Sequence, residues 1–112
     1  MGSLSYMSPE QVMGRTVDHR TDLFSLGVVL YEAACGSRPF SGASSAELAS
    51  AILREKPKPI YSIAKGIPND LDKLIGRCLR KEADRRIQHI GDVKLALEEI
   101  KGDLDSMRLP VE

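Results

Sequence analysis

The sequence has no excess of either charge, because 16 basic residues balance 16 acidic residues in 112. A balanced chain offers no electrostatic footprint for nucleic acid or for an anionic membrane surface. Aromatic residues make up only 4% of the chain, which is too little for the stacking platforms that bind unpaired bases. These shortages argue against a nucleic-acid-binding function, and we expect no nucleic-acid partner.

Long apolar runs and cysteines are also scarce. The longest run, residues 26–30, is far shorter than the roughly 20 residues that cross a bilayer. The N-terminal MGSLSYMSPEQ has neither the basic nor the apolar stretch of a secretion signal. The two cysteines, Cys35 and Cys78, lie in apolar helical runs and are interpreted as buried free thiols, with a disulfide as the alternative. Free thiols suit a reducing compartment, so we expect a cytoplasmic chain with no membrane segment.

No self-contained catalytic or metal-binding pattern is visible. The sequence has no glycine-rich phosphate loop, and no Cys or His pair has the spacing of zinc ligands. His19 and His89 lie far apart in polar stretches, where we expect solvated or capping roles. The neighbouring acids at 98–99 and 103–105 are interpreted as solvated, since paired-carboxylate catalysis needs a cleft. From the residues alone we predict no catalytic residue, no metal ligand and no cofactor in this chain.

The stretch that organises the chain is TDLFSLGVVLYEAACG, residues 21–36. Its apolar residues occupy every side of a 3.6-residue period, which is typical of a helix buried all round. Thr21 is predicted as the N-cap, and Gly36 stands where a left-handed residue ends a helix. We therefore predict a central helix that the remaining helices must cover.

The other elements follow from local signals. Residues 1–7 are predicted to be extended, and a short helix at 8–12 begins with a Ser N-cap and Pro at its first position. Ser44 and Glu47 form a capping-box pattern that opens a second helix, which the KPKP at 56–59 ends. A third helix is predicted from 69 or 70 to 80 and a fourth over 90–101, with Gly102 as its end. The expected fold is all-α, with about four main helices in one domain at 1–101 and a tail or linker at 102–112.

Three features are not explained by packing alone. Ser8, Pro9 and Glu10 follow the segment GSLSYM, an acidic residue opens the apolar helix in DLFSLG at 22–27, and an arginine follows CLRKEADR at 78–85. With these motifs in this order, the chain resembles the C-terminal half of the large lobe of a protein kinase. It is most similar to the bacterial serine/threonine kinases of eukaryotic type. The resemblance runs from residue 2 to about 101 and implies a partial kinase C-lobe.

On this resemblance, Ser8-Pro9-Glu10 stands for the Ala-Pro-Glu motif that closes the activation segment. Arg86 falls on the arginine that pairs with the motif glutamate, although Arg85 is an alternative and the proline usual between Lys81 and this arginine is replaced by alanine. The resemblance implies a mostly buried ion pair between Glu10 and Arg86. Loss of one partner of such a pair typically costs about 3–5 kcal/mol; the alternative is that both are surface ions.

Asp22 to Gly27 matches the Asp-x-Trp-Ser-x-Gly signature of the central kinase helix, with Phe24 in place of tryptophan. Asp22 would then accept hydrogen bonds from the backbone of the catalytic loop; the alternative is a simple first-turn acid that favours the helix dipole.

The resemblance also implies a substrate-facing loop. Ser3 matches the hydroxyl residue that contacts the catalytic aspartate and lysine, and its alternative is an untethered serine near the terminus. Tyr6 and Met7 would line the pocket beside the residue that receives phosphate.

The parts of a kinase that bind ATP and magnesium are missing from this sequence. No H-R-D-x-x-x-x-N and no D-F-G occurs, and VDHRTD at 17–22 has the wrong spacing. Met1 matches an interior methionine of the activation segment, so we expect a truncated gene, a misassigned start or a fragment. The parent would transfer the γ-phosphate of ATP to protein Ser or Thr, whereas this chain alone is predicted to be inactive.

The expected partners are a protein substrate or the missing N-terminal part of the kinase, and exposed apolar surface is expected to cause self-association. Two alternatives remain open. One is a non-catalytic docking module that uses the second helix and the substrate-facing loop, and the other is an unrelated helical adaptor.

Overall fold

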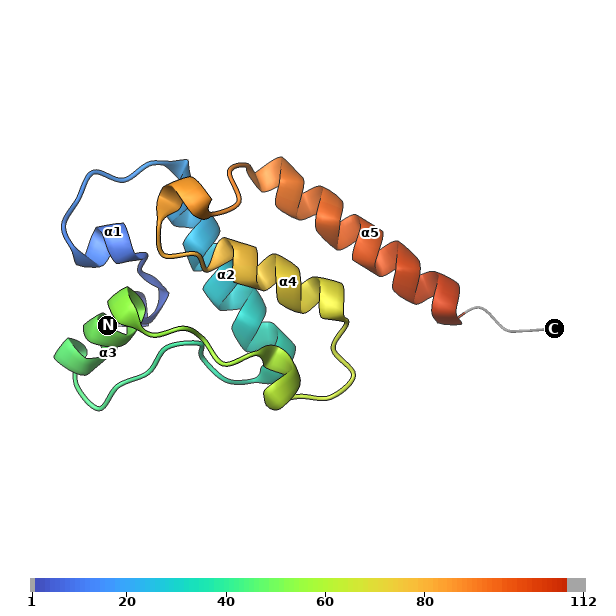
Figure 1. Cartoon of the computed structure of the whole chain (residues 1–112), viewed down its shortest axis with the longest axis horizontal. Helices are drawn as coiled ribbons and strands as arrows, with labels where there is room; N and C mark the ends of the chain where they lie inside the picture. Colours follow the sequence, from blue (N-terminus) through green and yellow to red (C-terminus); the bar gives the residue numbers. More distant parts are fainter. Residues whose placement is uncertain (1, 109–112) are drawn as a thin grey trace.

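The computed structural model describes residues 2–108, with side chains described from Leu4 to Ser106. Helices are the only regular secondary structure in the described residues, which confirms the predicted all-α class (Figure 1). In chain order they are η1 (Gly2–Tyr6), α1 (Pro9–Val12), α2 (His19–Cys35), α3 (Ser45–Arg54), η2 (Ile60–Ser62), α4 (Asn69–Cys78), η3 (Ala83–Arg85) and α5 (Ile90–Arg108), where η marks a short 3-10 helix.

The predicted central helix is α2, which packs along α4 and also contacts η1 and η2. Its end agrees with the sequence, since Gly36 has φ of 76° and its N–H donates to the Glu32 carbonyl. Its start was predicted wrongly, because α2 begins at His19 and its N-cap is Asp18 rather than Thr21. The Asp18 carboxylate accepts from the Arg20 backbone N–H at 2.9 Å, which leaves the Thr21 hydroxyl available for a tertiary contact.

One side of α2 is buried and the other is open. Phe24 and Val28 are completely buried, whereas Asp22, Val29 and Ala33 are exposed. Val29 keeps 49% of its surface accessible. The prediction of a helix buried all round is therefore correct for one face only, because the described helices cover only that face.

The close contact between α2 and α4 depends on Gly27. A Cβ added at this position would lie 2.7 Å from the Cys78 Cβ and 3.0 Å from the Leu79 Cδ2. These distances are too short for any side chain, so glycine sets how closely the two helices approach.

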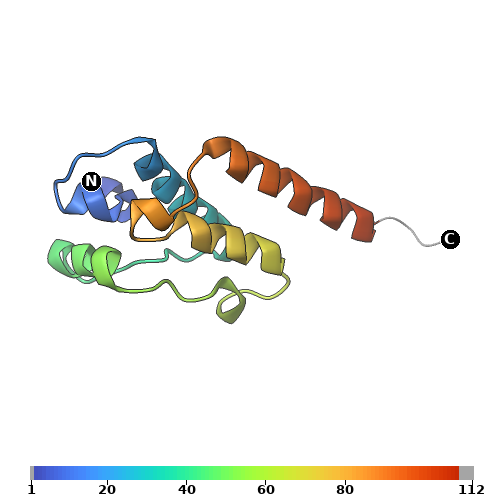
Figure 2. The same cartoon turned by 45° about the horizontal axis from the view of Figure 1, so that its top comes forward.

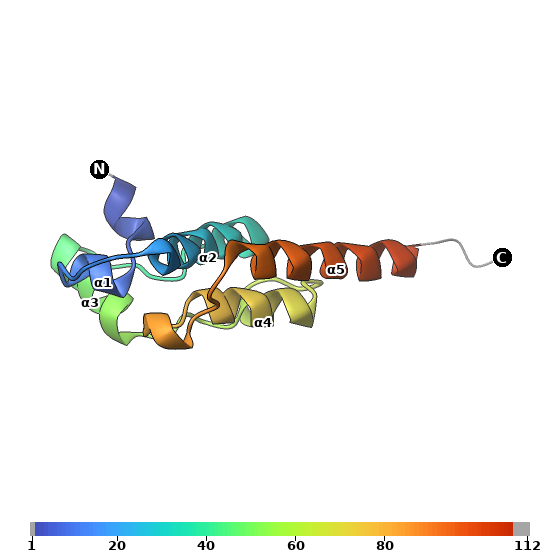
Figure 3. The ribbon, with the colours of Figure 1, turned by 90° about the horizontal axis from the view of Figure 1, so that it is seen from above.

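The core forms two neighbouring clusters. The first joins α2 to α3, to the loop that carries Phe40 and to Ile60 of η2. The second lies between α2, α4 and α5 and includes Leu23, Leu74 and Val93. Views from the other sides show α5 beginning beside α2 and α4 and then extending beyond them (Figures 2 and 3).

Local capping signals predicted the starts of α1 and α3 well. The Ser8 hydroxyl accepts from the Gln11 N–H, and the Gln11 side chain accepts from the Ser8 N–H, which closes a capping box. The Ser44 hydroxyl accepts from the Glu47 N–H at 3.1 Å. The Glu47 carboxylate, however, accepts from Ala43 rather than from Ser44, so the predicted capping box is shifted by one residue.

Two expectations for the ends of the chain were wrong. The segment 1–7 is not extended, since residues 2–6 form η1, where Leu4 and Tyr6 pack against the first core cluster. Gly102 does not end the last helix, because α5 continues to Arg108. A Cβ added at Gly102 would meet no atom within 4 Å, and Leu104, two residues on, packs against the second cluster. The domain boundary at 101 stays a prediction.

Candidate functional site

Glu10 and Arg86 lie 76 residues apart in the sequence and meet in the structure. Arg86 Nη1 donates to Glu10 Oε2 at 2.8 Å, and Nη2 donates to Oε1 at 3.0 Å. The Arg86 side chain has no accessible surface, and the Glu10 side chain retains 13% of its own. The ion pair implied by the resemblance is thus a buried, two-point contact between α1 and the residue that follows η3.

Every N–H of the Arg86 guanidinium has an acceptor. Besides Glu10, it donates to the backbone carbonyls of Arg20 at 2.7 Å, Arg80 at 2.9 Å and Lys81 at 3.1 Å. Its carbon Cζ lies 5.1 Å from the centroid of the Phe24 ring. A planar group with five donors above an aromatic face requires arginine, because lysine has one nitrogen and three donors.

A threonine completes the environment of Glu10. The Thr21 hydroxyl donates to Glu10 Oε2 at 2.7 Å, and the Ser8 hydroxyl is 3.4 Å from Thr21 Oγ1. Burial by itself raises the pKa of Glu10, but the hydrogen bonds from Arg86 and Thr21 outweigh it and lower the pKa to about 2. The carboxylate therefore stays charged throughout the neutral range.

We call this cluster of Glu10, Arg86 and Thr21 the anchor. It connects α1 to the first turn of α2 and to the segment between α4 and α5. A buried pair of this kind is weak evidence of net stabilisation, but loss of one partner leaves an uncompensated charge. Its geometry fixes where α1, and with it the preceding chain, sits on the helical lobe.

The expected substrate-facing residues lie just before α1. The Tyr6 hydroxyl donates to Glu32 Oε1 at 2.8 Å, and the Tyr6 carbonyl accepts from the Ser25 hydroxyl at 2.6 Å. Met7 is partly buried, and its N–H donates to the Leu4 carbonyl at 3.1 Å. Tyr6 is thus held on α2 by both ends.

The side chain of Ser3 lies outside the part of the chain whose side chains are described. Its expected contact with a catalytic aspartate and lysine therefore stays a prediction.

Asp22 and Gly27 occupy different surroundings on α2. Asp22 is exposed in the first turn of the helix, and its carboxylate has no hydrogen-bond partner in the described residues. The catalytic loop that it was expected to hold is not in this sequence. Gly27 lies instead where α2 crosses α4, beside Cys78 and Leu79. Neither Asp22 nor Gly27 is therefore part of the anchor.

Two further contacts have no signal in the sequence. The Lys81 amine donates to the Ile52 carbonyl at 2.6 Å and lies 4.2 Å from the Phe40 ring centroid. Burial lowers the pKa of this amine to about 8. The Arg38 guanidinium donates to the Ser5 hydroxyl at 2.9 Å. No local pattern predicts such pairs, because they join separate elements.

Metal-ligating side chains do not cluster in the described part of the chain. No three His, Cys, Asp or Glu side chains converge there as a metal site would require. His19 stacks on His89 with ring centroids 5.7 Å apart, and both are exposed. Within residues 2–108, no helix has the length and apolar character needed to cross a membrane.

Comparison with known proteins gives consistent matches. A sequence model described as the protein kinase domain matches residues 1–98. A probable serine/threonine-protein kinase of Clostridium perfringens is 44% identical over 103 residues, which are 92% of this chain and 15% of that protein. The serine/threonine-protein kinase PknB of Mycobacterium tuberculosis is 38% identical over 97 residues, 87% of this chain and 16% of that protein. The chain thus spans about 15–16% of the length of these curated relatives.

Proposed function

Since this chain belongs to the protein kinase family and is a fragment of a serine/threonine kinase, we propose that its full-length protein transfers the γ-phosphate of ATP to protein Ser and Thr hydroxyls. The observation that carries this proposal is the anchor. Its motif glutamate and arginine meet as a buried, two-point pair, in sequence positions that a kinase uses to close its activation segment.

The role of the chain in that reaction is positioning. Phosphoryl transfer needs little covalent chemistry from the protein and depends on alignment and electrostatics. Glu10 and Arg86 hold α1 on the lobe, and Tyr6 is tied to α2 through Glu32. We propose that residues 3–7 face the protein substrate and that the anchor sets their place.

ATP and magnesium would be bound by other parts of the full-length protein. A kinase holds them with a glycine-rich loop, a strand lysine and the Asp-Phe-Gly aspartate, and none of these occurs in the sequence. The chain alone is therefore proposed to transfer no phosphate. Two unbridged thiols, Cys35 and Cys78, support a reducing, cytoplasmic location, since disulfides are rare there.

The remainder of the kinase domain is the partner that we propose for the open side of α2. An apolar pocket of about 300 Å³ lies between α2 and α5, lined by Leu26, Val93 and Leu97 among others. Val29 of α2 and Ile90 of α5 are exposed, and Ile90 also lines this pocket. Burying apolar surface stabilises a protein by about 25 cal/mol per Å². Without the remainder of the kinase domain to cover this surface, the chain is expected to associate with itself.

The experiment compares the full-length protein with the 112-residue chain, using radiolabelled ATP, magnesium and a generic protein substrate. We expect phosphoserine or phosphothreonine from the full-length protein and none from the chain. Phosphate transfer by the chain alone would contradict the proposal that other parts of the full-length protein bind ATP and magnesium. A folded full-length protein that transfers nothing would contradict the kinase proposal and leave a non-catalytic docking module.

A further inference from the structure

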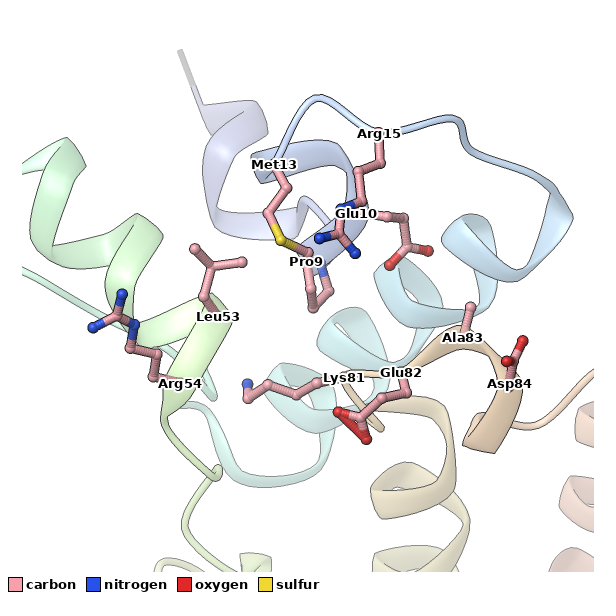
Figure 4. Close-up of a pocket in the computed structure, with 10 residues that line it drawn as sticks. All are labelled: Pro9, Glu10, Met13, Arg15, Leu53, Arg54, Lys81, Glu82, Ala83 and Asp84. Atoms are coloured by element: carbon pink, nitrogen blue, oxygen red, sulfur yellow. The ribbon is translucent and has the colours of Figure 1, made fainter.

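A pocket of about 590 Å³ opens next to the anchor (Figure 4). Its walls come from three places: α1 and the loop after it, the last turn of α3, and the segment from Lys81 into η3. Pro9, Met13 and Leu53 supply apolar wall. The pocket is separate from the apolar pocket between α2 and α5, with which it shares no residue.

The charged side chains of this pocket differ in whether they have an ion-pair partner. Two of its acids are already engaged, since Glu10 accepts from Arg86 and Asp84 lies 3.1 Å from Arg20. Its cations, Arg15, Arg54 and Lys81, have no carboxylate within 4.0 Å in the described residues. Glu82 is the acid that remains to offset them. The formal charges of the lining balance, with three cations and three carboxylates, but Glu82 is the carboxylate of the three that has no ion-pair partner in the described residues.

Lys81 is the cation that a bound anion would stabilise most, because its amine is partly buried. The amine donates to the Ile52 carbonyl and lies 4.2 Å from the Phe40 ring centroid, so two of its three N–H groups have no hydrogen-bond acceptor in the described residues. Burial lowers the pKa of the amine to about 8, and nearby negative charge would favour its charged form. Figure 4 shows Arg15 reaching down toward Pro9 and Lys81 extending from the opposite wall toward α3.

We propose that this pocket binds a phosphomonoester group, with Arg15 and Lys81 as its cationic contacts and Arg54 at the rim. A phosphomonoester carries nearly two negative charges at neutral pH and three strong acceptor oxygens. It matches several separated cations better than a carboxylate, which carries one charge. The pocket is larger than the phosphate group, so the ester carbon would lie against Leu53 and Met13.

The bound group would bridge elements on both sides of the anchor. Arg15 follows α1, which carries Glu10, and Lys81 precedes Arg86, which also donates to the Lys81 carbonyl. A ligand that holds both cations would tie α1 to this segment beside the ion pair, since Glu10 also lines the pocket. The site does not depend on the proposed phosphoryl transfer.

The test titrates the full 112-residue chain with O-phospho-L-serine, with a phosphothreonine peptide and with the same peptide unphosphorylated. The readouts are phosphorus NMR of the ligand and amide shifts of the chain. This chain suits the test because it carries no nucleotide-binding loop that could bind phosphate elsewhere. We expect saturable binding of both phosphorylated ligands and none of the unphosphorylated peptide.

Arg15→Gln should weaken binding at least tenfold, and Arg15 is exposed, so the substitution should leave the fold intact. Arg77→Gln removes an exposed arginine of α4 outside the pocket and should leave affinity within twofold.

Tighter binding of the peptide supports a protein side chain as the source of the ester, and equal binding supports a free metabolite. Absence of saturable binding, or equal affinity in Arg15→Gln, would overturn the proposal.

Discussion

Replacing Arg86 by methionine is the perturbation with the largest expected effect on this chain. Methionine fills part of the volume but donates no hydrogen bond. The change removes both bonds to Glu10 and three bonds to backbone carbonyls. The Glu10 carboxylate, 13% exposed, would then lie in the lobe with Thr21 as its remaining side-chain donor.

The magnitude follows from the burial of the pair. Removing one partner of a buried ion pair costs about 3–5 kcal/mol of stability. We expect Arg86→Met at the upper end of this range, because three backbone carbonyls also lose their hydrogen-bond donor. Glu10→Gln should cost less, about 1.5–3 kcal/mol, because it loses charge-assisted bonds but keeps an acceptor. Against a total stability of about 5–15 kcal/mol for a small domain, either loss is large.

Urea unfolding followed by circular dichroism measures these differences, with Arg77→Met as the matched control for an exposed arginine. The double variant Glu10→Gln with Arg86→Met completes a cycle, and its loss should be smaller than the sum of the single losses. A difference below about 1 kcal/mol between Arg86→Met and Arg77→Met, the size of an exposed pair, would refute the reasoning.

Three further predictions concern acid stability, helix packing and association. The pKa of Glu10 is about 2 in the fold against an ordinary 4.5. Its contribution to the free energy of unfolding, about 3 kcal/mol, is therefore complete above pH 4.5 and lost as the pH falls to 2. Glu10→Gln should flatten this part of the pH profile of urea unfolding. Gly27→Ala should lower the melting temperature, because overpacking costs about 1–3 kcal/mol, whereas Gly76→Ala, where nothing lies within 4 Å, should raise it. Light scattering should show self-association of the chain that Val29→Lys reduces, and a monodisperse monomer would contradict the exposed apolar face.

Local chemistry predicted the parts of the fold that depend on neighbours in sequence. Gly36 ends α2 in the left-handed conformation, and Ser8 and Ser44 cap their helices, because each signal acts within one turn. Thr21 shows the limit of this reasoning, since threonine and aspartate are both good N-caps and only the tertiary contact with Glu10 separates Thr21 from Asp18.

The candidate site was less accessible to such reasoning. The meeting of Glu10 and Arg86 came from the family resemblance, because no periodicity relates residues 76 apart. Lys81 and Phe40 were missed for the same reason, since their contact depends on how α3 and the loops pack. The end of the last helix was predicted wrongly for a different reason. Glycine is a weak stop signal at position 102, and the packing of Leu104 against the second cluster outweighs it.

The most direct test of the central claim is a segment exchange. The matching 103 residues of the Clostridium perfringens relative are replaced by this sequence, and transfer from labelled ATP is measured. We predict that the exchanged protein transfers phosphate, that Arg77→Met leaves transfer unchanged, and that Arg86→Met abolishes most of it. A folded exchange protein without activity, or one in which Arg86→Met transfers phosphate as fast as Arg77→Met, would contradict the account.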